Sequence, residues 1–590
     1  EATVSEKIKT AESAAIWSAL SELRYLFRHA LLRDAAYGMQ IQAHRQQLHQ
    51  LAAHTIETLY KADLTPYYTD LALHFGQARQ TVKAAHYAAL AGKQAAYQFD
   101  NKTAVDYLTQ ALDLTPLNDV AKRLDLLLTR EAVYGQQGAR EKQAADLTEL
   151  QTIAAQLENP EQKIDILRRE TEFALFTSDY PRAIRAAQQA VALAQATDHL
   201  VLHTQTKISF GNVLMRQGEV TAAQEQLEQA YALAHQTQSS REQALCAQNL
   251  SYVYMRMGAF EKGKTYGLRA FELAQEIDNW GQVGFALTNV GTCCMHLGQI
   301  DEAEHYYTQS LEAKRKVGDR YGESGAVHNL GNAAYYQGKL DETATRFAQA
   351  LKLKRAVGDR EGEGMMYHNL GLLYQTLGFF EQSKAHYEKS LAISQELNAS
   401  ARLAATKQIF GLLLHYLGEQ STAQSYCEEA LAHARQKDLR PHQANALNNL
   451  GYILAAQGHV DKARAALLEA IALRQESKQE NLAIEAMAGL LPLPGNTEQD
   501  QQIWLETTLG FLETKGTNGM LEPSRVHLTC YQALAQQNDV RAAPLLQKAY
   551  AQLMEQANKL ADPAAKHAFL NNVVANQAIV ELHKNDTISA

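Results

Sequence analysis

Residues 258–265 have a spacing that could do chemistry, because they read GAFEKGKT and match the phosphate-binding pattern G-x-x-x-x-G-K-[ST]. In that pattern, backbone N–H groups of a glycine-rich loop surround the phosphates and the lysine supplies a positive charge. The loop must follow a buried strand and lead into a helix. The elements around residues 258–265 therefore decide whether the match has chemical meaning.

The histidines and cysteines offer no metal or catalytic arrangement. His328 and His368 lie 40 residues apart, and on separate helix pairs they would be at least about 8 to 10 Å apart, too far to share one zinc ion. The sequence contains no H-E-x-x-H or G-x-S-x-G motif. Its five cysteines are scattered through apolar runs, which predicts buried thiols in a reducing compartment. We therefore expect no enzyme activity, no cofactor and no metal.

A repeated asparagine is the most informative polar feature. It recurs at Asn249, Asn289, Asn329, Asn369 and Asn449, always two residues before a repeated small residue. A carboxamide offers both a donor and an acceptor, so a column of them can hold the backbone of an extended peptide. The alternative is that the same amides bond between repeats and set the pitch of the superhelix.

Other polar and aromatic residues lie on or near the same predicted face. We include five of them with the asparagines in a predicted partner-binding site: Tyr252, His328, Asn332, His368 and Tyr452. Taken singly, a histidine or tyrosine on such a wall is more often a packing or solvated group.

All these positions belong to internal repeats with a period of 40 residues. One glycine phase comprises Gly211, Gly291, Gly331, Gly371, Gly411 and Gly451, with Ser251 in the missing place. A second glycine follows seven residues later in every copy, at Gly218, Gly258, Gly298, Gly338, Gly378, Gly418 and Gly458. The second glycine is expected to end a helix, because glycine adopts the left-handed conformation without steric cost.

Small residues recur after that turn, and the later one is followed by a bulky apolar residue in each copy. Small residues let two helices approach closely, while the large one fills the adjoining space. Each repeat is therefore predicted to be a pair of helices. In this frame Gly258 is a turn glycine and Gly263 is a small residue of the second helix. No strand would precede residues 258–265, so we expect no nucleotide binding there.

The order Leu-Gly, then Ala, an aromatic residue and Ala resembles the tetratricopeptide repeat. The resemblance implies an all-α fold, an α-solenoid in which about 11 or 12 helix pairs form a right-handed superhelix. The usual unit has about 34 residues, so a period of 40 implies longer helices or an extended connector at VGDRYGE and VGDREGE. Such units are similar to those of kinesin light chain and of Pins-type adaptors.

Repeat quality divides the chain into four predicted regions. Residues 1–60 are expected to be a helical segment that follows an upstream domain, since the chain begins at Glu1 and is taken to be a fragment. Residues 61–198 are predicted to be divergent repeats and residues 199–480 regular ones. Residues 481–590 are predicted to be divergent repeats with a capping helix, set off by glycines and prolines at 489–500.

Both ends of the chain resemble bacterial signal-transduction ATPases with numerous domains. The N-terminal likeness rests on Phe27, Arg28, His29, Ala30, Asp34, Ala35, Tyr37, Arg45 and His49. The C-terminal likeness rests on residues 522–534, 539–550 and 561–580. Without the family, Phe27, Leu31 and Leu32 predict an amphipathic helix, with His29 as a packing residue.

The resemblance implies a non-catalytic sensor of a larger bacterial signalling ATPase, which captures a protein or extended peptide in its superhelical groove and acts on the upstream ATPase domain. The alternatives are a stand-alone scaffold of the Pins or kinesin-light-chain kind, and a substrate-selecting appendage of a transferase or cyclase. A net charge of −9 argues against nucleic acid or an anionic membrane as the main partner. No apolar stretch is long enough to span a membrane, and we expect a cytoplasmic protein.

Overall fold

The computed structural model describes residues 17–21, 24–27, 37, 41–98, 100–437, 439–477, 479–517 and 519–589. The chain divides into two compact units, residues 1–219 (unit 1) and residues 220–590 (unit 2). From α3 onward, the described residues form α-helices joined by short turns, with one 3-10 turn, η1 (Thr65–Tyr67). The predicted all-α helical-repeat fold is confirmed for this part of the chain.

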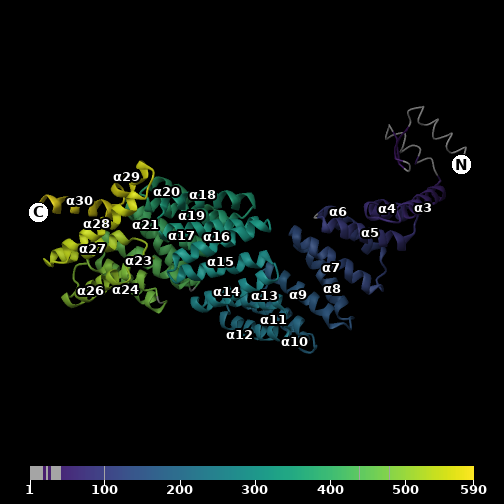
Figure 1. The fold of residues 1–590 in the computed structure, drawn as a ribbon, viewed down its shortest axis with the longest axis horizontal. Coiled ribbons are helices and arrows are strands. Elements are labelled where there is room, and N and C mark those ends of the chain that lie inside the picture. Colours follow the sequence, from purple (N-terminus) through teal and green to yellow (C-terminus); the bar gives the residue numbers. More distant parts are fainter. Residues whose placement is uncertain are drawn as a thin grey trace. The chain divides into compact units, whose positions relative to one another are not determined.

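The described part of unit 1 contains two paired β-strands, followed by helices that pack in sequence order (Figure 1). The strands are β1 (Trp17–Ser21) and β2 (Arg24–Phe27). The helices are α3 (Gln42–Leu59), α4 (Tyr68–Gln77), α5 (Thr81–Tyr97), α6 (Asn101–Leu114), α7 (Val120–Gln137), α8 (Arg140–Ala154), α9 (Pro160–Phe176), α10 (Tyr180–Gln195) and α11 (Leu200–Gln217).

Phe27 lies in strand β2 and not in the amphipathic helix that was expected to include it, so the prediction is corrected at this residue. Strands β1 and β2 pair antiparallel, with Trp17 opposite Phe27 and Ala19 opposite Tyr25. Aromatic residues favour a pleated strand, which explains why this segment pairs instead of coiling. Other residues of the N-terminal prediction lie outside the described part of the chain: Arg28, His29, Ala30, Leu31, Leu32, Asp34 and Ala35.

Unit 2 contains the regular repeats and the C-terminal helices. The repeat helices are α12 (Val220–Gln236), α13 (Ser240–Arg256), α14 (Phe260–Glu276), α15 (Trp280–His296), α16 (Ile300–Lys316), α17 (Arg320–Tyr336), α18 (Leu340–Ala356), α19 (Arg360–Thr376), α20 (Phe380–Glu396), α21 (Ser400–Tyr416), α22 (Gln420–Gln436), α23 (Arg440–Ala456) and α24 (Val460–Glu476). The C-terminal helices are α25 (Glu480–Leu490), α26 (Glu498–Thr514), α27 (Pro523–Gln536), α28 (Ala542–Asn558), α29 (Pro563–Asn571) and α30 (Val574–Ser589).

Long helices, and not extended connectors, account for the period of 40 residues. Helices α13 to α24 are each 17 residues long. Only Val317, Gly318 and Asp319 separate α16 from α17. The Asp319 side chain accepts a hydrogen bond from the Gly322 N–H and so caps α17. The segment VGDRYGE is therefore a tight turn followed by the first residues of a helix.

In three repeats, at Gly291, Gly331 and Gly371, the glycine of the first phase lies where an aromatic side chain of the second helix crosses the first helix. A Cβ on Gly371 would lie 2.6 Å from the ring of Tyr387, and a Cβ on Gly331 would lie 2.6 Å from the ring of Phe347. Ser251 is the exception in this phase, and its repeat has Gly267 in place of the aromatic residue. Small and large residues are thus exchanged between the two helices, and the close packing of the pair is preserved.

The turn glycine at Gly378 has two structural reasons. Its φ is 79°, in the left-handed region that favours glycine. A Cβ there would also lie 2.5 Å from the Ala568 carbonyl oxygen at the end of α29. The repeat turn therefore accommodates a helix from a distant part of the sequence.

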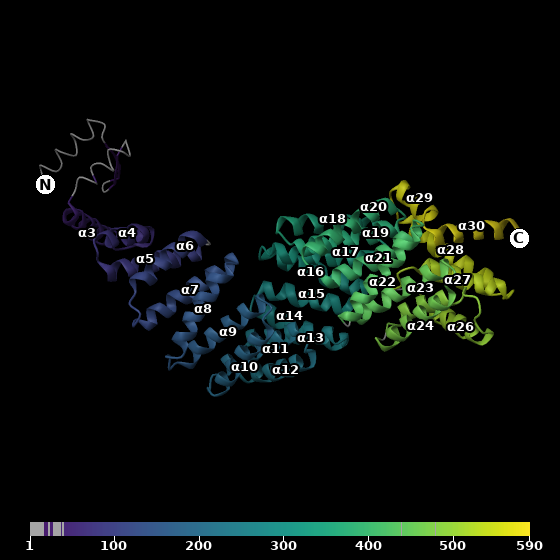
Figure 2. The same cartoon turned by 180° about the vertical axis from the view of Figure 1, so that it is seen from behind.

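The C-terminal helices fold back onto the middle repeats of unit 2, and both views show α29 beside α20 (Figures 1 and 2). Leu370 and Leu373 of α19 share one apolar cluster with Leu553 of α28 and Phe569 of α29. The Asn572 side chain donates a hydrogen bond to the Gly378 carbonyl oxygen at 3.1 Å. The C-terminal helices therefore cover the repeat surface near α19 and the turn at Gly378.

Candidate functional site

The repeated asparagine lies on one face of five first helices of unit 2, and Ile409 takes its place on α21. Residues spaced by four, three and four along a helix share a face. We call this face the amide stripe. Its members are Leu245, Asn249, Tyr252 and Arg256 on α13; Phe285, Asn289, Thr292 and His296 on α15; Gly325, Asn329, Asn332 and Tyr336 on α17; Met365, Asn369, Leu372 and Thr376 on α19; Ala405, Ile409, Leu412 and Tyr416 on α21; and Asn445, Asn449, Tyr452 and Ala456 on α23.

The stripes of successive first helices face the same side of unit 2. Members from three helices line a single pocket: Leu372, Thr376, Ile409, Leu412, Tyr416 and Asn449. Because the repeats are equivalent, the stripes of α13, α15 and α17 occupy the same register. The predicted face of the asparagine column is therefore a continuous surface of first helices.

This surface is exposed at one end and covered at the other. Three aromatic side chains on α13, α15 and α17 are exposed, Tyr252 by 40%, Phe285 by 52% and Tyr336 by 48%. Asn449 on α23 is only 6% exposed. The cover over the stripes of α19 to α23 comes from residues 521–525, α27, α29 and α30.

The amides of the column mostly donate to the preceding repeat. The Nδ2 of Asn289 donates to the Gln248 carbonyl oxygen at 3.3 Å, and that of Asn449 donates to the Gln408 carbonyl oxygen at 3.0 Å. The Nδ2 of Asn369 lies 2.8 Å from His328 Nε2. In each case the partner is 41 residues earlier, on the preceding first helix. This geometry supports the inter-repeat role for these three amides.

The two remaining asparagines behave differently. The Nδ2 of Asn249 donates to the Leu245 carbonyl oxygen of its own helix at 2.8 Å. Asn329 has no hydrogen-bond partner among the residues that the structure describes. Gly325, one turn earlier on the same stripe, faces open space at its Cβ position. The stripe of α17 is therefore the part with a free amide and room beside it.

Two family models match the helices that carry the stripe. The tetratricopeptide repeat model matches residues 240–316, 323–396 and 364–436, and a second tetratricopeptide repeat model matches residues 443–477. This part of the chain therefore consists of tetratricopeptide repeats. All the matched residues lie in unit 2 and include the five asparagines of the column.

Solved structures of other proteins resemble the chain at low identity. A Rap protein complexed with Competence and Sporulation Factor is 13% identical, with a TM-score of 0.46 and coverage of 62% of this chain and 99% of its own. A Signal Transduction ATPase with Numerous Domains from Pyrococcus horikoshii, which has a tetratricopeptide repeat sensor, is 16% identical with a TM-score of 0.46; the match covers 64% of this chain and 56% of that one. The apo quorum sensor NprR from B. thuringiensis is 14% identical with a TM-score of 0.38, covering 68% and 99% of the two chains. No curated protein matches the chain.

The two histidines of the predicted site are enclosed by the tetratricopeptide repeats. His328 Nε2 lies within 3.1 Å of the Asn332 side chain, and His368 Nδ1 lies 3.1 Å from Thr406 Oγ1. Burial, with positive charge at Arg402 and other nearby basic groups, lowers the pKa of each histidine to about 3. Both imidazoles are therefore neutral at physiological pH, and their positions favour the packing role.

Tyr452 lies at the covered end, where sequence reasoning missed the contact with the C-terminal segment. Its hydroxyl donates to the Glu485 carbonyl oxygen at 2.8 Å, and the Arg525 guanidinium lies 3.5 Å from its ring centroid. Arg525 also pairs with Glu522, whose carboxylate accepts a hydrogen bond from Tyr416 at 2.6 Å. The sequence contains one signal for this contact. Glu522 and Arg525 stand among apolar residues, and charged groups need partners when they are buried.

Residues 258–265 lie across a turn between two helices, as the repeat frame predicts. Gly258 ends the α13 turn with a φ of 75°, and Gly263 lies inside α14, where a Cβ would be 2.8 Å from Cys293 Sγ. The ammonium of Lys264 donates to Gln299 at 2.8 Å and to Glu302 at 2.6 Å. A helix precedes this segment, whereas a phosphate loop follows a strand.

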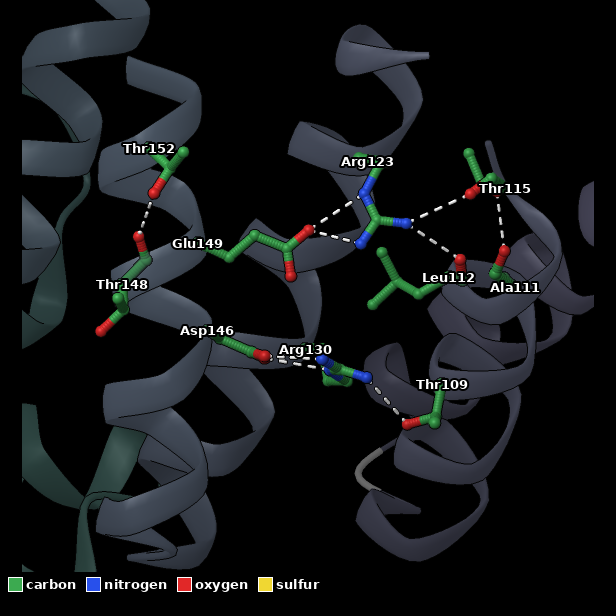
Figure 3. Close-up of polar contacts among 10 residues, drawn as sticks. All are labelled: Thr109, Ala111, Leu112, Thr115, Arg123, Arg130, Asp146, Thr148, Glu149 and Thr152. Carbon is green, nitrogen blue, oxygen red and sulfur yellow. Dashed lines mark hydrogen bonds and ion pairs between the residues drawn. The ribbon is translucent and has the colours of Figure 1, made fainter. Parts of the chain in front are cut away.

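Ion pairs and hydrogen bonds of two arginines join neighbouring helices of unit 1 (Figure 3). Arg130 on α7 binds Asp146 on α8 through two N–H groups, at 3.0 and 2.6 Å, and also donates to Thr109 on α6 at 3.0 Å. Arg123 similarly links Glu149 of α8 to carbonyl oxygens at the end of α6. The two arginines and the two carboxylates are therefore paired with one another, and these pairs stabilise the packing of the helices in unit 1.

The remaining candidates for a metal or redox site in the described part of the chain are its Cys, His, Asp and Glu side chains. The five cysteines are buried free thiols, as predicted. No group of three or more His, Cys, Asp or Glu side chains within the described ranges is placed to hold a metal ion. None of the helices described here combines the length and apolarity that crossing a membrane requires.

Proposed function

We propose that this tetratricopeptide-repeat protein captures a protein or extended peptide along the amide stripe of unit 2 without catalysing a reaction. The observation that carries the proposal is the exposure of Tyr252, Phe285 and Tyr336 on three successive first helices. Aromatic side chains supply much of the binding energy at protein interfaces, and large exposed apolar side chains grouped on one surface are typical of interaction sites.

The stripe of α17 offers the contacts that an extended backbone needs. The free carboxamide of Asn329 can both donate to and accept from a peptide group. The open space at Gly325 lets a main chain approach the helix closely. In this proposal Asn289, Asn369 and Asn449 hold the repeats in register, while Asn329 contacts the partner.

We further propose that the chain serves as the sensor of a larger bacterial signalling ATPase. The resemblance of both ends of the chain to bacterial signal-transduction ATPases supports this role. Three residues of the N-terminal resemblance contact one another in the structure. The Tyr37 hydroxyl lies 3.1 Å from His49 Nε2, and the Arg45 guanidinium lies 5.1 Å from the Tyr37 ring centroid. An ATPase domain encoded upstream of Glu1 is expected, and reading the coding sequence tests this part directly.

Position-dependent crosslinking in living cells tests capture along the stripe. Benzoylphenylalanine at Thr292 or Asn332, both on the stripe, should crosslink the same partner, because both positions face the same surface. The same probe at Thr265 or Thr308, which are exposed on second helices, should not capture it. Equal capture from second-helix positions, or none from the stripe, would contradict the proposal.

A further inference from the structure

A pocket lies where the C-terminal helices meet the repeats of unit 2. Its volume is about 210 Å³, and a cavity of roughly 150 Å³ already holds a benzene molecule. Much of its wall is apolar and comes from five helices: Leu372, Phe380, Ile409, Leu412, Leu528 and Phe569. The space therefore suits one aromatic ring with a small substituent.

Two polar atoms of this pocket have neither a hydrogen-bond partner nor an ion-pair partner among the described residues. One is Oδ1 of Asn448, an acceptor on a residue that is only 8% exposed. The other is Nε of Arg525, a donor, although Nη1 of the same guanidinium contacts Glu522 and Tyr416. Both residues line the pocket. Buried polar atoms are nearly always hydrogen-bonded, so these two call for a ligand with one donor and one acceptor.

The charged groups around the pocket already have partners. Arg525 forms an ion pair with Glu522. The Glu485 carboxylate accepts hydrogen bonds from the backbone N–H groups of Leu521 and Glu522. A ligand with a net charge would upset this pairing in a poorly solvated space, where an unpaired charge is strongly unfavourable. An uncharged ligand is therefore favoured.

We propose that this pocket binds a compact, uncharged ligand that has an apolar body and one carboxamide. The ligand N–H donates to Asn448 Oδ1, the ligand carbonyl oxygen accepts from Arg525 Nε–H, and the body packs against Leu412 and Ile409. Because the walls come from both the repeats and the C-terminal helices, the bound ligand tightens the closure between them. This site is separate from the exposed stripe and does not rest on the partner-binding proposal.

Three probes of nearly the same shape separate the two hydrogen bonds from apolar contact. Benzamide has the donor and the acceptor, acetophenone has only the acceptor, and α-methylstyrene has neither. Titrated into the full chain and followed by calorimetry or ligand-observed NMR, benzamide should bind saturably. Acetophenone should bind about tenfold more weakly, and α-methylstyrene about tenfold more weakly again, since each loss leaves a buried polar atom unpaired. Apolar burial alone would give the reverse order.

Two substitutions in the full chain locate the binding. Asn448→Leu should weaken benzamide about tenfold and leave α-methylstyrene binding unchanged, because only the acceptor is lost. Ile409→Phe should abolish binding of all three probes by filling the space, with helicity and melting temperature confirming that each variant folds. The proposal is overturned if benzamide does not bind, if α-methylstyrene binds as tightly as benzamide, or if Ile409→Phe binds benzamide normally. Should Asn448→Leu fail to fold, the wild-type probe series still decides.

Discussion

Replacing Arg525 with methionine should lower the free energy of unfolding of unit 2 by about 3 kcal/mol at neutral pH. The substitution keeps much of the side-chain volume but removes the partner of a carboxylate in a largely enclosed site, and such a loss costs roughly 3 to 5 kcal/mol. We expect the lower end because 16% of the Arg525 side chain is exposed. The hydrogen bond to Tyr416 and the contact with the Tyr452 ring are lost as well. Urea denaturation followed by circular dichroism measures the effect.

A second substitution separates the stranded charge from lost packing. Adding Glu522→Gln to Arg525→Met removes the unpaired carboxylate, so about half of the lost stability should return. A double variant no more stable than Arg525→Met alone would show that the ion pair does not set the cost. Arg541→Met, which breaks an exposed ion pair with Glu506, is the matched control and should cost under about 1 kcal/mol.

Replacing Glu485 with glutamine should stabilise unit 2 at alkaline pH. Burial raises the pKa of the Glu485 carboxyl to about 7, although backbone N–H groups of Glu522 and Leu521 and the Arg525 charge oppose this shift. Between the unfolded-state pKa near 4.5 and the folded-state value, the folded protein binds the extra proton, so stability falls as pH rises. A glutamine oxygen still accepts the two N–H groups but carries no charge.

The gain from Glu485→Gln should therefore depend on pH. From pH 5 to pH 8 the difference in unfolding free energy between variant and wild type should grow by about 2 to 3 kcal/mol, then stay level above pH 8. Denaturation at each pH measures it. A constant difference across this range would show that Glu485 is not held in its protonated form. A glutamine variant that becomes less stable than wild type as pH rises would show that the protein favours the ionised carboxylate, and so would contradict a pKa raised by burial.

The repeat architecture could be predicted from the sequence because its determinants are local and recur. Gly371 and Tyr387 are 16 residues apart within one repeat, and the same pair of sizes recurs at Gly331 and Phe347. A periodic pattern of this kind reports helix pairing without long-range information. The repeat pattern also predicts that Lys264 lies in a helix pair, and in the structure its ammonium contacts Gln299 and Glu302 of the next pair.

The roles within the site could be predicted only in part. The column of asparagines predicted one shared face, but periodicity could not distinguish Asn329, which has no hydrogen-bond partner among the described residues, from Asn449, which bonds to the preceding repeat. A peptide-binding role and an inter-repeat role both require an asparagine at the same position of the repeat. The distinction depends on the offset between neighbouring helices, which the repeat pattern does not encode.

The covered end of the stripe could not be predicted because its contacts are distant in sequence. Tyr416 meets Glu522 across 106 residues, and Asp341 accepts a hydrogen bond from the Ala561 N–H across 220 residues. No periodic signal connects such positions. The β-hairpin was missed for a different reason, since a short segment rich in aromatic residues is compatible with either a helix or a strand until its pairing is seen.

Partner capture along the amide stripe is the central claim, and the affinity of the crosslinked partner segment tests it most directly. Calorimetric titration should compare wild type with a variant that carries Tyr252→Ser, Phe285→Ser and Tyr336→Ser. The matched control removes three exposed apolar side chains at the ends of second helices, through Val317→Ser, Val357→Ser and Leu397→Ser. Both variants should keep the wild-type melting temperature, because all the altered side chains are substantially exposed.

The account predicts that the stripe variant binds the partner segment at least tenfold more weakly than wild type, since aromatic interface residues often contribute more than about 1 kcal/mol each. The control variant should bind as wild type does. Wild-type affinity in the stripe variant, or an equal loss in both variants, would contradict capture along the amide stripe.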